Sequence, residues 1–120
     1  MIFILKIIAG DNHSFIINYD QNVLVWGDNS KGQLGVGNNK IIMTPKLNNF
    51  LPKNQVVDIK SKGDLNVCLL QNGKVLFWPF QKNNGCYIYK PVELPLPLNL
   101  KIAMVSCGFN FAMFVIIFYI

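Results

Sequence analysis

The feature that most constrains this chain is an internal repeat with a period near fifty residues. Gly10, Gly63 and Gly108 each follow a short apolar segment, at spacings of 53 and 45 residues. Trp26 and Trp78 each close a later apolar segment of their unit, 52 residues apart. A period of this length, with several short strand-like segments in each unit, is typical of a β-propeller.

The apolar segments within each unit predict short β-strands. They are rich in β-branched and aromatic residues, are bounded by turn residues and lack a helical period. The expected strands are residues 3–9, 14–18, 23–26, 56–60, 66–70, 74–78, 102–106 and 111–117. The second and third segments of each of the first two units are expected to pair as antiparallel hairpins. Asn72 and Gly73 form the clearest two-residue turn signal.

The first unit carries a longer motif that extends over residues 7–47. It contains Ala9-Gly-Asp-Asn-His-Ser14 and then Trp26-Gly-Asp-Asn-Ser-Lys-Gly-Gln-Leu-Gly-Val-Gly37. This pattern resembles the RCC1 repeat, in which Gly-x-x-His-Ser, Val-x-x-Trp-Gly and Asn-x-x-Gly-Gln-Leu-Gly-x-Gly follow in that order. The second unit is degenerate, with Asn66 where the first has His13, and Pro79 in place of the glycine after the tryptophan.

The expected fold is therefore all-β, a partial β-propeller of two to three antiparallel blades. Residues 1–120 are expected to form one RCC1-like repeat region, with a first repeat at about 1–52, a second at 53–98 and the start of a third at 99–120. The blades are expected to straddle these repeats. Complete RCC1-like propellers close a ring of about seven blades. The chain is therefore expected to be a fragment of a larger propeller.

The polar and aromatic residues of the motif are expected to be structural. Trp26 is expected to fill space between adjacent sheets, and Asn29 and Gln33 to satisfy loop amides. His13 is the only histidine and is expected to make a buried hydrogen bond. Ser14 cannot form a relay with it, because neighbouring strand residues point to opposite faces.

No catalytic, cofactor-binding or metal site is predicted, so the chain is not expected to be an enzyme. Residues 32–37 lack the Gly-Lys-Ser/Thr sequence of a P-loop and the βαβ setting of a dinucleotide loop. The three cysteines stand far apart, and a single histidine leaves a zinc site short of ligands. Unpaired cysteines favour a reduced, intracellular setting.

The basic balance of the chain does not predict a nucleic-acid site. The formal net charge is +5, but every basic residue is lysine and the lysines are scattered along the sequence. Arginine is the usual bidentate reader of phosphate and guanine. The charge is therefore expected to be dispersed and solvated.

The apolar run 102–120 leaves an alternative open. Its 19 residues reach the length of a membrane span. The repeat instead places Gly108 at a turn between two buried strands. Strands are favoured, and a membrane tether remains the alternative.

The resemblance implies a function carried by binding. RCC1-like propellers act as protein-interaction platforms, and some are guanine nucleotide exchange factors for small GTPases. The first hypothesis is a non-enzymatic protein-interaction module with a protein partner. The second is an exchange factor for a small GTPase, which needs a protruding wedge; residues 38–52 and 82–97 are the candidates. The third is a repeat protein tethered to a membrane through residues 102–120.

Overall fold

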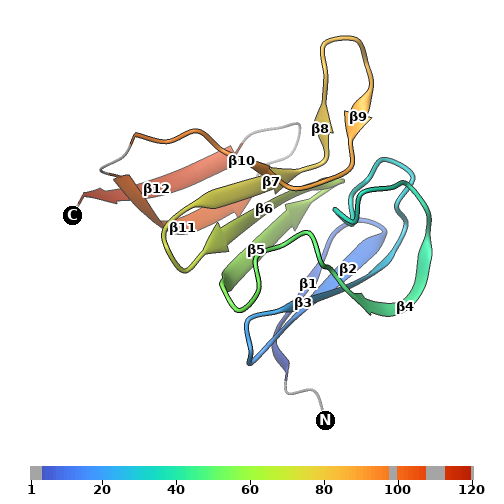
Figure 1. Ribbon diagram of the computed structural model, residues 1–120, viewed down its shortest axis with the longest axis horizontal. Helices are drawn as coiled ribbons and strands as arrows, with labels where there is room; N and C mark the ends of the chain where they lie inside the picture. Colours follow the sequence, from blue (N-terminus) through green and yellow to red (C-terminus); the bar gives the residue numbers. More distant parts are fainter. Residues whose placement is uncertain (1–3, 98–99, 108–112, 120) are drawn as a thin grey trace.

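The computed structural model describes residues 4–97, 100–107 and 113–119, and these form strands and loops without a helix (Figure 1). The first four-stranded sheet, called sheet A, has the order β1 (Ile4–Ala9), β2 (His13–Asn18), β3 (Val23–Gly27) and β4 (Ile42–Leu47). Sheet B has the order β10 (Val92–Glu93), β7 (Val75–Trp78), β6 (Leu65–Leu70) and β5 (Val56–Lys62). Two further hairpins pair β8 (Phe80–Gln81) with β9 (Tyr87–Ile88), and β11 (Leu100–Cys107) with β12 (Met113–Tyr119).

The strand pairings confirm the prediction of an all-β chain built from antiparallel blades. β2 pairs antiparallel with β3, and β6 with β7, as the hairpin signals predicted. The strands of sheet A lie within residues 4–47 and those of sheet B within 56–93. Each of the two sheets is therefore made from one continuous stretch of the chain, in which short turns pair neighbouring strands.

Three hairpins share one turn geometry with a three-residue loop. In each, the N–H of the residue before the loop donates to the carbonyl of the residue after it, at 3.0, 2.9 and 2.7 Å. The pairs are Asn18 with Asn22, Leu70 with Lys74, and Lys82 with Cys86. The last loop residue is Gln21, Gly73 or Gly85, with φ of 62°, 84° and 88°. A left-handed residue at this position is typical of three-residue hairpin loops.

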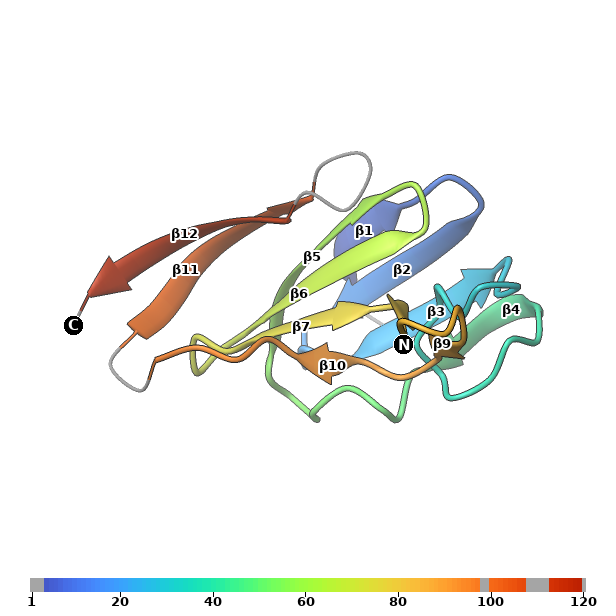
Figure 2. The same cartoon turned by 90° about the horizontal axis from the view of Figure 1, so that it is seen from above.

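The main core lies between sheets A and B. Its buried members come from both sheets and from the loops beside them: Phe15, Ile17, Val23, Val25, Leu34, Leu51, Val56, Ile59, Cys68, Leu70, Leu76 and Trp78. A second core lies between sheet B and β11, where Val67, Leu69 and Val75 pack against Ile102 and Val105. Figure 2 shows the β11–β12 hairpin, sheet B and sheet A following one another across the molecule.

The buried tryptophan is Trp78, and the expectation that Trp26 fills the space between the sheets is wrong. Trp78 is fully buried in the main core, whereas Trp26 is half-buried. Val25 belongs to that core. Successive strand residues alternate between faces, so its neighbour Trp26 points to the other face of sheet A.

The reason is a difference of one residue in hairpin length. Six residues run from His13 to Asn18, the last residue before the turn that follows β2, but only five run from Asn66 to Leu70 before the turn that follows β6. A shift of one residue exchanges the two faces of a strand. Trp78 therefore lies opposite Asn66, in the place that Gly27 occupies opposite His13.

The described residues of the segment 102–120 confirm the prediction of strands. β11 and β12 pair antiparallel from Leu100↔Tyr119 to Cys107↔Met113, and Ile102 and Val105 of β11 are buried. The turn predicted at Gly108 lies outside the described residues. No helix among the described residues is long and apolar enough to cross a membrane.

Candidate functional site

The residues of the sequence motif gather at one end of the interface between sheets A and B. His13 begins β2, Ser61 lies near the end of β5 and Asn66 near the start of β6, while Gln33 comes from the loop between β3 and β4. His13, Gln33 and Asn66 are buried and Ser61 is half-buried. These four residues are called the seam, because they join side chains from both sheets.

The imidazole of His13 is bonded across the seam. Its Nε2 lies 2.8 Å from Asn66 Oδ1 and 3.2 Å from Ser61 Oγ. Asn66 Nδ2 donates to the carbonyls of Gln33 at 2.7 Å and Trp78 at 3.2 Å. These two carbonyls fix which end of the Asn66 amide is the nitrogen, so the atom that faces His13 is the oxygen Oδ1. An amide oxygen can only accept a hydrogen bond, so His13 Nε2 must carry the ring proton. The prediction of a buried structural hydrogen bond at His13 is confirmed.

Burial keeps His13 neutral. Desolvation is the largest effect on His13 and lowers its pKa below the usual 6.5. The hydrogen bond with Asn66 and the carboxylates of Asp64, Asp11 and Asp28 raise the pKa, but by less than desolvation lowers it. Nδ1 is buried without a hydrogen-bond partner among the described residues. Protonation would place a charge and an unbonded N–H in this site, which is the physical reason for the lowered pKa.

The contact of His13 with Ser61 is not a nucleophile and base pair. Ser61 Oγ donates to Asn66 Oδ1 at 2.7 Å, and His13 Nε2 already holds a proton. No carboxylate among the described residues bonds His13 Nδ1 to orient the ring. Activation of a serine needs a free basic nitrogen and an oriented imidazole. Sequence reasoning considered only Ser14 and missed Ser61, which strand pairing alone brings to the seam.

Gln33 connects the loop of sheet A to sheet B. Its carbonyl accepts the Trp78 indole N–H at 2.9 Å, and its side-chain amide donates to Asp28 at 3.1 Å and Asp64 at 3.3 Å. Its Oε1 accepts the Lys31 N–H at 2.9 Å. The prediction that Gln33 satisfies loop amides is confirmed, and its side chain also bridges the two sheets.

Asn29 organises the same loop from within. Its Oδ1 accepts the Leu34 N–H at 3.0 Å, and its Nδ2 donates to the carbonyls of Asn38 at 2.9 Å and Lys40 at 3.0 Å. This role was also predicted. Gly35 has φ of 68°, and a Cβ there would lie 2.8 Å from Trp78 Nε1, so both conformation and space require glycine.

The seam places four segments at one end of the sheets, here called the loop end. They are the turns at 10–12 and 63–64, the loop 28–41 and the segment 79–89. The Asp11 N–H donates to the Gly63 carbonyl at 3.3 Å, and the Gly37 N–H donates to the Tyr89 carbonyl at 3.0 Å. Backbone contacts therefore hold neighbouring segments together, so the sheets support the loop end as one unit.

The β8–β9 hairpin projects from the loop end. Figure 1 shows it standing away from both sheets, and residues 80–86 are exposed. An edge-to-face contact between Phe77 and Phe80, with centroids 5.9 Å apart, anchors its base to β7. The candidate segments named for a wedge were 38–52 and 82–97; the projecting element is residues 80–88, and 38–52 contains β4 instead.

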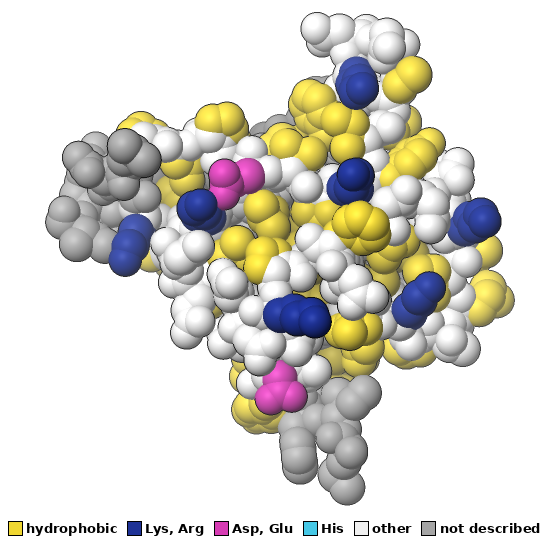
Figure 3. Space-filling view, viewed as in Figure 1, with side chains coloured by type: hydrophobic (Ala, Val, Ile, Leu, Met, Phe, Trp, Pro, Cys, Tyr) yellow, Lys and Arg dark blue, Asp and Glu magenta, His cyan; other side chains and the backbone are white. Residues whose placement is uncertain are grey.

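The surface of the described residues is described by its metal-ligating groups and its charges. No group of three or more His, Cys, Asp or Glu residues in the described ranges could hold a metal ion. On the face in Figure 3, lysines stand apart from one another among apolar and uncharged side chains.

Comparison with protein families identifies the repeat. Two models of the regulator of chromosome condensation (RCC1) repeat match residues 4–33 and 20–69. The chain is 30% identical over 110 residues to a protein RCC2 homolog of Danio rerio, covering 86% of this chain and 22% of that protein. A Xenopus laevis protein RCC2 homolog is 30% identical over 107 residues, at 84% and 21% coverage. The chain thus spans about a fifth of the length of these curated relatives.

Solved structures show the same fold. Human WBSCR16 matches with a TM-score of 0.72 and 18% identity, over 88% of this chain and 28% of that one. Prp20p from Saccharomyces cerevisiae, described with its binding properties to Gsp1p and histones, matches with a TM-score of 0.70 and 22% identity, over 88% of this chain and 29% of that one. Yeast RCC1 (Prp20) with Kap60 bound to it matches with a TM-score of 0.68 and 22% identity, over 86% of this chain and 28% of that one. The fold is a partial β-propeller of antiparallel blades.

Proposed function

This chain belongs to the RCC1 repeat family, and on that premise we propose that it is a non-enzymatic module that binds a partner protein through its loop end. The observation that carries the proposal is the seam, in which His13, Asn66 and Gln33 join two sheets by buried hydrogen bonds. Buried hydrogen bonds between the two sheets hold the loops of both sheets in a fixed relative position, so that these loops can act as one surface. Loops on a rigid scaffold commonly provide binding sites in proteins.

The β8–β9 hairpin is the proposed point of first contact. Its tip combines a cation, two amides and exposed backbone at Lys82, Asn83 and Asn84, all exposed. Two-stranded hairpins have little stability alone, so the Phe77–Phe80 contact and the Tyr89–Gly37 bond support its base. A supported projection can enter a concave partner surface without a large ordering cost.

Protein partners reported for similar proteins support this class of ligand. Prp20p was described with its binding to Gsp1p and histones, and yeast RCC1 with Kap60 bound to it. We propose a protein partner for this chain as well, with a small GTPase as the second candidate class. The three free cysteines and the likeness to these proteins support a reducing, intracellular setting.

The test measures direct binding of the purified chain to core histones and to a panel of small GTPases by biolayer interferometry. We expect saturable binding to at least one of them, weakened about tenfold by Lys82→Glu combined with Asn83→Ala. Lys53→Glu is the control. Lys53 is exposed, and its segment contacts the turn between β2 and β3 at Gln21 and Asn22, which is at the other end of the strands from the loop end.

Binding by none of these proteins, or equal loss with the Lys53 variant, would contradict the proposal. Nucleotide exchange is the second candidate function, and the projecting hairpin is the feature that favours it. We rank it below simple binding, because the chain covers only 28–29% of the solved propellers it resembles. An exchange factor displaces nucleotide by using a large rigid interface, of which this chain presents a part.

We also propose the division into repeats at about 1–52, 53–98 and 99–120. The support is that sheet A lies within the first range and sheet B within the second. If the division is correct, limited proteolysis cuts the projecting hairpin 80–86, the segment 48–55 between the sheets, or residues 94–97 after β10, before it cuts a strand of sheet A or sheet B. Early cuts within sheet A or sheet B would argue against it.

A further inference from the structure

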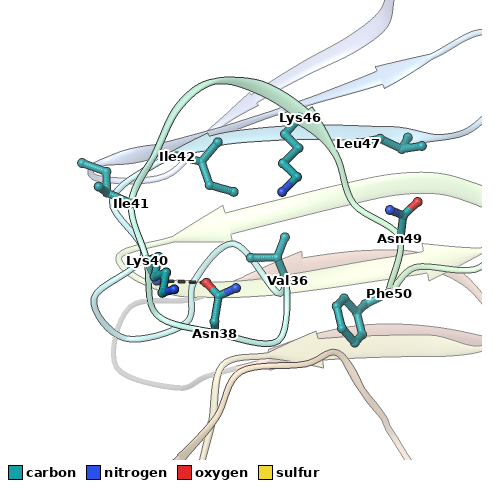
Figure 4. A pocket seen from close by; sticks show the side chains of 9 residues that line it. All are labelled: Val36, Asn38, Lys40, Ile41, Ile42, Lys46, Leu47, Asn49 and Phe50. Atoms are coloured by element: carbon teal, nitrogen blue, oxygen red, sulfur yellow. Dashed lines mark hydrogen bonds between the residues drawn. The ribbon is translucent and has the colours of Figure 1, made fainter.

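The outer edge of sheet A borders a pocket that lies apart from the β8–β9 hairpin, although residues 36–41 of the loop end form one side of it. β4 is the last strand of sheet A and pairs only with β3, through an irregular register between Leu47↔Leu24 and Ile42↔Gly27. A pocket of about 290 Å³ lies between β4, the loop 36–41 and residues 49–50. Figure 4 shows Lys46 and Val36 pointing into this space and Phe50 at one end of it. It is called the β4 pocket below.

The β4 pocket combines an apolar lining with positive charge. Its nine lining residues are Val36, Asn38, Lys40, Ile41, Ile42, Lys46, Leu47, Asn49 and Phe50. None of the nine is acidic. Lys40 and Lys46 are both exposed, and neither belongs to an ion pair found among the described residues. Two cations without an anion beside an apolar lining are complementary to a ligand that carries both a carboxylate and an apolar group.

Large apolar side chains are exposed around the same pocket. The exposed fractions are 62% for Ile41, 79% for Met43, 42% for Leu47 and 48% for Phe50. Such a cluster, with a polar rim, marks an interaction site more often than isolated exposed residues do. The wall is also closely fitted, because a Cβ on Gly37 would lie 2.7 Å from Phe50 Cζ. Gly37 thus makes room for the ring that closes the pocket.

We propose that the β4 pocket binds an extended segment of a partner protein in which an aspartate or glutamate stands beside a large apolar residue. The apolar side chain packs among Val36, Ile42 and Phe50, and the carboxylate lies between Lys40 and Lys46. Pro45 in β4 has no N–H, so an added strand would find an interrupted hydrogen-bonding edge. Recognition therefore rests on side chains. The pocket shares residues 36–41 with the loop end but contains no residue of the β8–β9 hairpin, the proposed point of first contact, and so goes beyond the function proposed there.

The experiment uses the full chain of 120 residues and a fluorescein-labelled hexapeptide. The peptide alternates glutamate with phenylalanine or leucine, carries the fluorescein on its N-terminal amine and is amidated at its C-terminus, so its termini are uncharged and the label contributes the same charge to every peptide compared. Binding is measured by fluorescence anisotropy. Lys46→Glu and Lys40→Glu should each weaken binding by about tenfold or more. Lys101→Glu changes net charge equally, but lies on β11, away from β4, and should alter binding by less than about twofold.

Four further measurements make the outcome decisive. A peptide with glutamine in place of glutamate should bind at least about tenfold more weakly, because it loses the charge. Phe50→Ala should weaken binding without loss of the fold, since its ring is half-exposed; far-ultraviolet circular dichroism checks each variant. A single-stranded oligonucleotide should not displace the peptide. Absence of binding, equal weakening by Lys101→Glu, or displacement by the oligonucleotide would each overturn the proposal. The hairpin variant of the previous section should bind the peptide normally.

Discussion

Replacing Asn66 by alanine tests whether the seam holds the two sheets together. The side chain is fully buried and accepts from His13 Nε2 and Ser61 Oγ, at 2.8 and 2.7 Å. Its amide donates to the carbonyls of Gln33 and Trp78. Three partners keep another bond: His13 still reaches Ser61 at 3.2 Å, Ser61 Oγ still donates to the Leu65 carbonyl at 3.3 Å, and the Gln33 carbonyl still accepts the Trp78 indole N–H at 2.9 Å. The carbonyls of Trp78 and Asp64 lose this amide donor, which costs about 1–3 kcal/mol each, so we expect a loss of about 2–4 kcal/mol.

The assay is urea unfolding followed by tryptophan fluorescence, with the free energy of unfolding as the quantity compared. Asn84→Ala is the control, because Asn84 is an exposed hairpin-tip residue whose loss should cost less than about 0.5 kcal/mol. Asn66→Leu keeps the number and branching of the side-chain heavy atoms but removes the polar atoms, so it should be as damaging as alanine. A loss below about 0.5 kcal/mol for Asn66→Ala, or full recovery with leucine, would refute the polar seam as the source of stability.

Four further predictions follow from the same contacts. Burial lowers the pKa of His13 below 6.5, so near and below that pH the unfolded chain binds a proton that the folded chain does not. The free energy of unfolding should therefore be constant above about pH 6.5 and should decrease as the pH falls below it. The His13→Gln variant should show a weaker dependence on pH. Trp78→Ala should cost about 3–5 kcal/mol and Trp26→Ala clearly less in the same urea assay, and equal losses would contradict the face assignment. Cys86 is exposed and should react with a thiol reagent within minutes, whereas buried Cys68 should react only on unfolding; equal labelling rates would contradict this burial. The purified chain should leave nucleotide release from small GTPases at its intrinsic rate in a fluorescent-nucleotide assay, and clear acceleration would promote exchange to the first hypothesis.

Local signals were sufficient for the strands and their hairpins. Asn72 and Gly73 predicted the turn between β6 and β7, because a left-handed residue and a side-chain bond within the loop act over only a few residues. The motif of residues 26–37 predicted a glycine-rich loop held by Asn29 and Gln33, and both amides do bond that loop. These features depend on residues that are close in the sequence, so a single segment of the chain is enough to predict them.

Tertiary structure decided which side chains meet across the sheets. The spacing of Trp26 and Trp78 suggested equivalent roles, yet one residue fewer in a hairpin arm reversed the face, and only Trp78 is in the main core. The partnership of His13 with Asn66 and Ser61 spans 53 and 48 residues and exists only because sheets A and B stack at one register. Periodicity specifies that a strand has an apolar face. The packing of one sheet on another determines which face becomes buried and which polar atoms are left to bond there.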